Sequence, residues 1–100
     1  MRRVLTTRQR QYLKGLAHPL SPTVRVGKGG ATPAVIGEVK KALLAHELIK
    51  VRIDVDESAG RRSIAEQLAA AADAQLVGTI GKIAVLYRTR DEKPKIKLPK

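Results

Sequence analysis

The hydrophobic and polar positions of this 100-residue chain follow two spacings, one typical of helices and the other of strands. Apolar residues three and four positions apart predict amphipathic helices. The first helix follows Thr6 or Thr7, either of which can cap it, and ends at His18-Pro19 because a residue before proline avoids the helical region. Thr32-Pro33 starts the second helix with a cap and a proline at its first position.

Alternating apolar residues predict strands over residues 23–26, 49–55, 76–80 and 83–87. A third helix is predicted from about Gly60 to Ala72. The last two strands flank Gly81-Lys82, a pattern typical of a β-hairpin with a two-residue turn. The order α-β-α-β-α-β-β predicts an α+β fold with two layers, in which a four-stranded mixed sheet has its helices packed mainly on one face.

The composition is that of a single folded domain. Leu, Ile and Val account for 27 residues, enough for a core of this size. We expect one domain over residues 1–90 and a loosely held basic tail over residues 91–100. No apolar stretch approaches the ~20 residues that cross a bilayer, and the start of the chain lacks a secretory segment. These features predict a soluble, cytoplasmic, monomeric protein without a membrane partner.

The charge predicts the kind of partner. Twenty Lys and Arg residues against nine Asp and Glu give a net charge of +11, which favours binding to a polyanion such as RNA. The alternative is a basic surface that is merely solvated. Tyr12 and Tyr87 are the only aromatic residues, so base stacking can contribute little. Recognition of phosphates and shape is therefore favoured over sequence-specific reading of a single strand.

A glycine-rich loop, Gly27-Lys28-Gly29-Gly30, lies between a strand and a capped helix. Glycine lets the backbone approach a ligand closely, and the amides at the helix start favour phosphate. Lys28 adds a cation at the tip, although a tight turn without a ligand is the alternative. The flanking RNA-binding candidates are Arg10, Lys14, Arg25 and Lys41, with Lys50 and Arg52 as a second group on a charged strand face that could be solvated.

Other kinds of site fit the sequence poorly. The loop lacks the spacing of a P-loop, and Thr32 stands where a dinucleotide fingerprint needs glycine or alanine. His46-Glu47 begins like a zinc-protease signature, but Lys50 replaces the second histidine ligand. Cysteine is absent, His18 and His46 are the only histidines, and no spacing links them to a serine. We therefore expect no catalytic residues, no metal, no cofactor and no small-molecule substrate.

Six segments along the chain form an ordered set of motifs: Lys14–Leu20, Val26–Gly30, His46–Val51, Ile80–Lys82, Val85–Arg88 and Lys95–Pro99. Together they cover nearly the whole chain and resemble the CRM domain, the RNA-binding module of chloroplast splicing factors and bacterial ribosome-maturation proteins. The last segment is similar to the tail of the single-domain bacterial members, called YhbY-like.

The resemblance implies a fold similar to the C-terminal domain of a bacterial translation initiation factor. It also implies a GxxG loop like that of KH domains, where the loop clamps backbone nucleotides. Here that loop is Gly27–Gly30, and the additional Gly29 makes it more flexible than the motif requires. Because the single-domain members are associated with precursors of the large ribosomal subunit, we expect a non-catalytic protein that binds ribosomal RNA during assembly. The alternatives are a structural protein of the mature ribosome and a protein-interaction module that uses the open sheet face.

Overall fold

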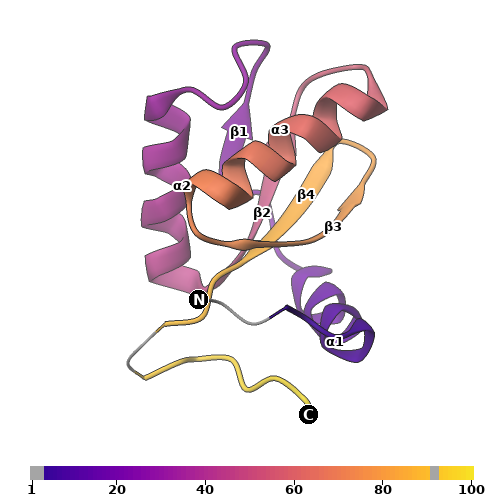
Figure 1. Cartoon of the computed structure of the whole chain (residues 1–100), viewed down its shortest axis with the longest axis vertical. Helices are drawn as coiled ribbons and strands as arrows, with labels where there is room; N and C mark the ends of the chain where they lie inside the picture. The colour runs from indigo at the N-terminus through magenta and orange to yellow at the C-terminus, as the bar shows by residue number, and fades with distance from the viewer. Residues whose placement is uncertain (1–3, 91–92) are drawn as a thin grey trace.

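The computed structural model describes residues 4–90 and 93–100. The predicted order of elements is confirmed, and the strands form one central sheet with the helices packed around it (Figure 1). The elements are α1 (Thr7–Ala17), β1 (Val24–Val26), α2 (Pro33–His46), β2 (Leu48–Ile53), α3 (Ser58–Ala71), β3 (Gln75–Ile80) and β4 (Ile83–Tyr87).

The four strands form a mixed sheet in the order β1-β2-β4-β3. Strand β1 pairs with β2 in parallel, and the β2–β4 and β3–β4 pairs are antiparallel. The hairpin between β3 and β4 turns at Gly81, whose φ of +57° suits a residue without a Cβ. A register shift between Leu76 and Gly78 interrupts β3. The predicted mixed sheet and the two-residue hairpin turn are both present.

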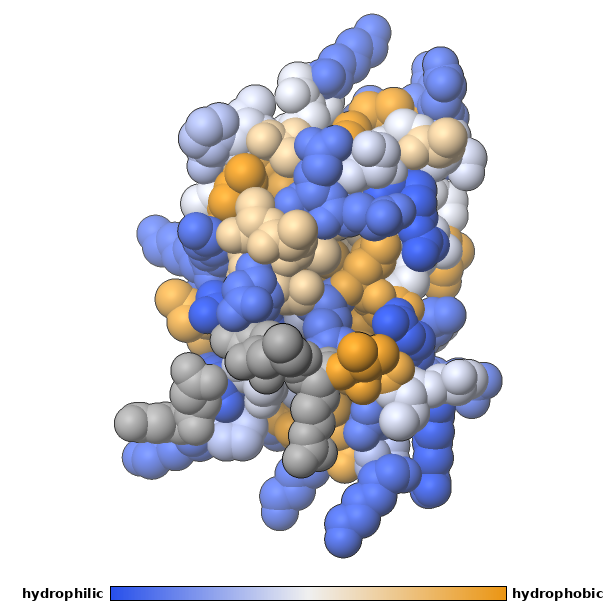
Figure 2. Space-filling model, in the orientation of Figure 1, coloured by the Kyte–Doolittle hydropathy of each residue, from blue (hydrophilic) through white to orange (hydrophobic). Residues whose placement is uncertain are grey.

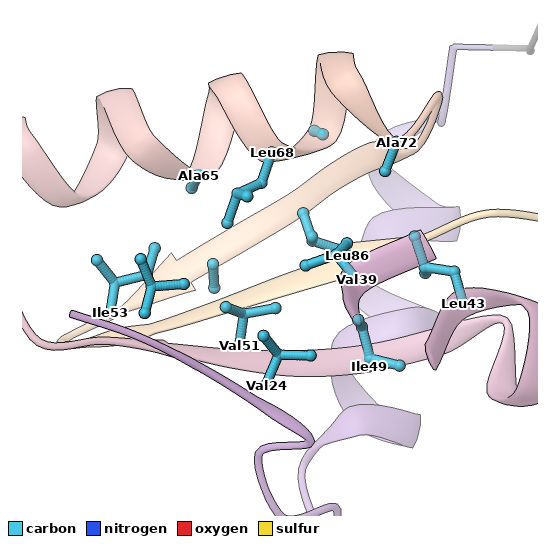
Figure 3. Close-up of a cluster of buried hydrophobic side chains, with 13 residues drawn as sticks. Val24, Val39, Leu43, Ile49, Val51, Ile53, Ala65, Leu68, Ala72 and Leu86 are labelled. Carbon is cyan, nitrogen blue, oxygen red and sulfur yellow. The ribbon is translucent and has the colours of Figure 1, made fainter. Parts of the chain in front are cut away.

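The main core lies between one face of the sheet and the helices α2 and α3 (Figure 3). Alternate residues of β2 point to this side, as the period of two in a strand requires. Val39 and Leu43 cover the sheet from α2, and Ala65 and Leu68 cover it from α3. The sheet contributes Val24, Val26, Ile49, Val51, Ile53, Ala84 and Leu86 to this cluster.

Helix α1 packs on the opposite face of the sheet. Leu13 and Ala17 form a second cluster with Leu5 and with residues of β2, β3 and β4, among them Leu48, Val77, Val85 and Tyr87. Two of the three helices therefore share one face, in agreement with the predicted packing, and the third covers part of the other. The remainder of that second face, on β1 and β2, carries charged side chains.

The element boundaries differ from the prediction by one or two residues. Strand β2 runs from Leu48 to Ile53. It begins at Leu48 because α2 ends at His46 and the single residue between them, Glu47, reverses the chain with a positive φ of 62°. Helix α3 begins at Ser58 rather than Gly60. Gly60 lies in its first turn, where an added Cβ would be 3.3 Å from Cγ1 of Val55. Close packing against Val55, rather than a helix boundary, thus accounts for this glycine.

The C-terminal tail is bound to the body of the protein, which contradicts the expectation that it is loosely held. Glu47 is fully buried, and its carboxylate accepts hydrogen bonds from the backbone N–H groups of Arg90 (2.8 Å), Lys95 (2.6 Å) and Ile96 (2.9 Å). Ile96 and Leu98 also pack against the α1 cluster. Of the predicted tail, positions 91 and 92 lie outside the described residues.

Replacing Glu47 with alanine should destabilise the fold and release the tail. The substitution leaves three backbone N–H groups without their acceptor, and we expect the free energy of unfolding to fall by about 2–4 kcal/mol. Thermal melting measures the loss, and trypsin cleavage after Lys95 and Lys97 measures release of the tail. Glu47→Gln keeps one carbonyl oxygen at the site and should fall between the parent and the alanine variant. Parental melting and parental cleavage rates for Glu47→Ala would show that this carboxylate does not hold the tail.

Candidate nucleic-acid interface

The glycine loop that follows β1 is a tight turn at one end of the molecule (Figure 1). Gly30 N–H donates to the Gly27 carbonyl at 3.1 Å, so that Lys28 and Gly29 occupy the two central positions of the turn. Gly30 has a φ of +72° and is the residue whose conformation requires glycine. An added Cβ on Gly29 would meet Cγ2 of Thr32 at 3.6 Å, an ordinary contact. Gly29 therefore tolerates a side chain, as does Gly27, where an added Cβ would meet no atom within 4 Å.

Several amides at the start of α2 are already used within the protein. The Thr32 hydroxyl accepts from Val35 N–H at 3.2 Å, Thr32 N–H donates to the Gly30 carbonyl at 2.9 Å, and Pro33 has no N–H. A phosphate at this site would therefore depend on the turn itself and the exposed Lys28 more than on the helix start. The sequence predicted a larger share for the helix amides, because it did not indicate which of them the threonine would engage.

Two arginines lie side by side on the exposed part of the α1 face of the sheet. Arg25 of β1 and Arg52 of β2 are register partners in the parallel pair. Their side chains remain partly exposed, at 71% and 42%, and both donate through Nε to the carboxylate of Asp54. The structure thus brings together Arg25, one of the flanking RNA-binding candidates, and Arg52, one of the second group. It also places beside them Asp54, an acid that the prediction did not include.

The pKa of the Asp54 carboxyl lies below its ordinary value, because its hydrogen bonds with Arg25 and then Arg52 stabilise the charged form. The lowered pKa means that these pairs stabilise the fold above the ordinary aspartate pKa. That contribution is lost as the pH falls through the lowered value. Near neutral pH, Asp54 stays charged and holds both guanidinium groups.

Lys50 and Lys14 extend the positive charge towards α1. Nζ of Lys50, the next residue on the same face of β2, donates to the His18 carbonyl at 2.9 Å. The Lys14 side chain crosses β3 at Gly78, where a Cβ would lie 2.7 Å from Cε of Lys14. Gly78 thus provides the space through which this lysine crosses the strand.

Arg10 and Lys41 are not part of this arrangement. Nη1 of Arg10 donates to the carbonyls of Leu76 (2.6 Å) and Val77 (3.1 Å), beside the register shift in β3. These bonds favour a structural role for Arg10. Lys41 is exposed on α2, the helix that covers the sheet face opposite to Arg25 and Arg52.

Hydrophilic side chains project from most of the outline of the molecule in Figure 2, and hydrophobic surface shows between them in patches. Over residues 4–90 and 93–100, no helix is both long and apolar enough to cross a membrane. Within the same residues, His, Asp and Glu side chains form no group that could hold a metal ion.

Sequence reasoning missed the two residues that join the end of α2 to the rest of the chain. Glu47 binds the tail, and the Arg90 guanidinium donates to the carbonyls of Leu44 and Ala45 at 2.6–2.9 Å. These bonds satisfy carbonyls that a helix end leaves without partners. The position of Glu47 between the second predicted helix and the following strand was visible in the sequence, but no spacing indicated which residues it would bind.

The chain was compared with known proteins and structures. Residues 5–88 match the CRS1 / YhbY (CRM) domain. A Haemophilus influenzae protein named RNA-binding protein is 44% identical over 96% of both chains. Bacillus subtilis YqeI, named as a probable RNA-binding protein, is 40% identical over 96% of this chain and all of its own.

The fold is also found in a solved structure. The solution structure of the hypothetical protein SAV1595 from Staphylococcus aureus superposes with a TM-score of 0.86 at 36% identity. The match covers 96% of this chain and 100% of that one. The match over residues 5–88 and relatives of nearly equal length establish that this chain belongs to the CRS1 / YhbY (CRM) domain family.

Proposed function

We propose that this protein is a non-catalytic RNA-binding protein that binds ribosomal RNA and associates with precursors of the large ribosomal subunit. It acts in the cytoplasm as a monomer and without a cofactor. The observation that carries the proposal is the placement of the Gly27–Gly30 turn directly after a strand whose Arg25 lies beside Arg52. The names of the relatives, RNA-binding protein among them, support RNA as the partner.

The geometry fits a stretch of RNA backbone. Arg25 lies two residues before Gly27, about 7 Å along the strand, so a phosphate at the turn and one at the arginine pair can belong to the same strand of RNA. Guanidinium groups bind phosphate oxygens through paired N–H donors, and Lys28 supplies a point charge at the tip. This arrangement reads backbone and shape, in keeping with a chain whose two aromatic residues are Tyr12 and a buried Tyr87.

A protein-interaction module using the open sheet face is less well supported. Helix α1 covers part of that face, and the part of it on β1 and β2 carries Arg25, Lys50 and Arg52. Protein interfaces are depleted in charged residues at their centre, whereas RNA surfaces are rich in them. The second alternative is a structural protein of the mature ribosome, which would bind RNA through the same kinds of contact. The two functions are distinguished by whether the protein binds precursor particles or mature ribosomes.

Sedimentation tests the assembly role. In a gradient of cell lysate at low salt, the protein should sediment with large-subunit precursors and be depleted from translating ribosomes. High salt should remove it from the precursors, because phosphate contacts weaken as cations compete for the RNA. Quantitative immunoblotting of the fractions checks both points. Equal abundance in precursors and translating ribosomes would favour the structural rival, and release that does not depend on salt would argue against phosphate contacts.

Replacing Asp54 with asparagine should strengthen RNA binding. The substitution frees Arg25 and Arg52 from their shared carboxylate and removes a negative charge from the strand face. We expect affinity for ribosomal RNA fragments to rise about two- to fivefold at low salt. The salt dependence should steepen by roughly 0.7–0.9, the contribution of one additional phosphate. Filter binding over a salt series measures both quantities.

Glu66→Gln is the matched control for this experiment. It removes the same charge from the exposed side of α3, where Glu66 pairs with Arg62, and α3 covers the sheet face opposite to Arg25 and Arg52. The control should bind RNA within about twofold of the parent, since charges beyond a Debye length of ~8–10 Å are largely screened. If Asp54→Asn melts like the parent but binds no better than Glu66→Gln, Arg25 and Arg52 do not contact the RNA.

A further inference from the structure

An apolar pocket of about 340 Å³ lies beside the first residues of β2. Its walls come from three parts of the chain: Leu16 and Leu20 at the end of α1 and just after it, Leu48 and Ile49 in β2, and Ile96 in the tail. Leu16 and Leu20 are 39% and 41% exposed, so the pocket presents apolar surface to solvent. Strand β1 leads from this pocket, which Thr23 lines, to the glycine loop.

The polar side chains that line the pocket are two hydroxyl groups and one imidazole ring. Ser21, Thr23 and the exposed ring of His46 complete its lining. Glu47, the neighbour of His46, directs its carboxylate to the N–H groups of the tail, and among the described residues 4–90 and 93–100 no acid lines the pocket. The backbone of Leu48 adds further polar atoms. The Glu47 carbonyl accepts from Arg88 N–H, and Ile53 N–H donates to the Lys82 carbonyl, so the backbone groups of these two residues point towards β4. Backbone groups alternate in direction along a strand, and those of Leu48 therefore point towards the β1 side. Strand β1 begins only opposite Val51, so it does not extend as far as Leu48.

Two lysines place positive charge next to residues that line the pocket. Nζ of Lys50 donates to the carbonyl of His18, which lies between the two leucines of the wall along the chain. Nζ of Lys95 donates to the carbonyl of Ala45 at 3.2 Å, next to His46. An apolar slot with an imidazole ring, hydroxyl groups and two neighbouring cations is complementary to a nucleobase and its flanking phosphates.

We propose that this pocket binds an unstacked nucleobase of the same RNA whose phosphates contact Arg25, Arg52 and the glycine loop. The proposal rests on the proposed function and adds a base-binding site to it. His46 stacks on the base, Leu16 and Leu20 pack against its face or edge, and the Ser21 and Thr23 hydroxyl groups lie at its polar edge. The charge complementarity favours a base over an apolar side chain of a partner protein.

The test combines crosslinking with a salt series, using ribosomal RNA fragments that contain 4-thiouridine. In the full-length parent, ultraviolet crosslinks should map to the pocket lining at residues 16–23 or 46–49. His46→Ala and Leu20→Ala should each weaken binding about five- to tenfold, the loss expected for one stacked base. The slope of log affinity against log salt should stay that of the parent, because no phosphate contact is lost. His46→Phe should restore binding, since it restores an aromatic ring.

Tyr12→Leu is the matched control, because it removes an exposed aromatic ring from a site outside the pocket. It should bind within about twofold of the parent, and all variants should melt near the parent since the substituted side chains are exposed. Crosslinks confined to other segments, or parental affinity in both pocket variants, would overturn the proposal. So would variants that keep parental RNA affinity but lose a protein partner from the precursor. A parent that binds no RNA would instead refute the proposed function.

Discussion

Glu47 joins the junction of α2 and β2 to two segments that are distant in sequence, the end of β4 and the C-terminal tail. It is the single residue between α2 and β2, and its backbone carbonyl accepts from Arg88 N–H just after β4. Its side chain binds the N–H groups of Arg90, Lys95 and Ile96. A fully buried carboxylate is tolerated only with hydrogen-bond partners, so burial and attachment of the tail require one another. This arrangement places Ile96 in the lining of the pocket and Lys95 beside the end of α2, where its Nζ donates to the Ala45 carbonyl.

The two faces of the sheet differ in their side chains: one supplies the core, and the other carries the cations that we propose to bind RNA. The face under α2 and α3 is apolar and supplies the core, so its residues are fixed by packing. The opposite face is covered by α1 over β3 and β4, and on β1 and β2 it presents Arg25, Lys50 and Arg52. These cations are costly to place together without an anion, and Asp54 offsets part of that repulsion in the free protein. A phosphate backbone would replace this acid as the counter-charge.

The features that the sequence predicted are those determined locally. Thr6 caps α1, Thr32 and Pro33 begin α2, and Gly81 turns the hairpin, each through contacts within a few residues. The alternating and helical patterns determined which faces are buried and so the order of elements. The features it missed depend on residues far apart in sequence. The partners of Glu47 lie 43 to 49 positions away, and the carbonyls that bind Arg10 lie 66 and 67 positions away. An arginine looks the same in a sequence whether its side chain binds a backbone carbonyl or remains exposed. Only the fold shows that Arg10 bonds to carbonyls of β3 and that Arg25 lies on an exposed strand face.

The glycine loop provides the most direct test of phosphate binding, through substitution of Lys28 and Gly29 together with aspartate. Gly27 and Gly30 are kept, so the positive φ at Gly30 is preserved, and the space around Gly29 accepts a Cβ. Affinity for ribosomal RNA fragments should fall on the order of 30- to 1000-fold, from about 2–4 kcal/mol of lost contact and added repulsion, at an unchanged melting temperature. A variant with Ala59→Asp and Arg62→Asp on α3 changes the net charge equally and should lose far less. If the loop variant melts like the parent and binds RNA as well as the α3 variant, the loop is only a turn and does not bind phosphate.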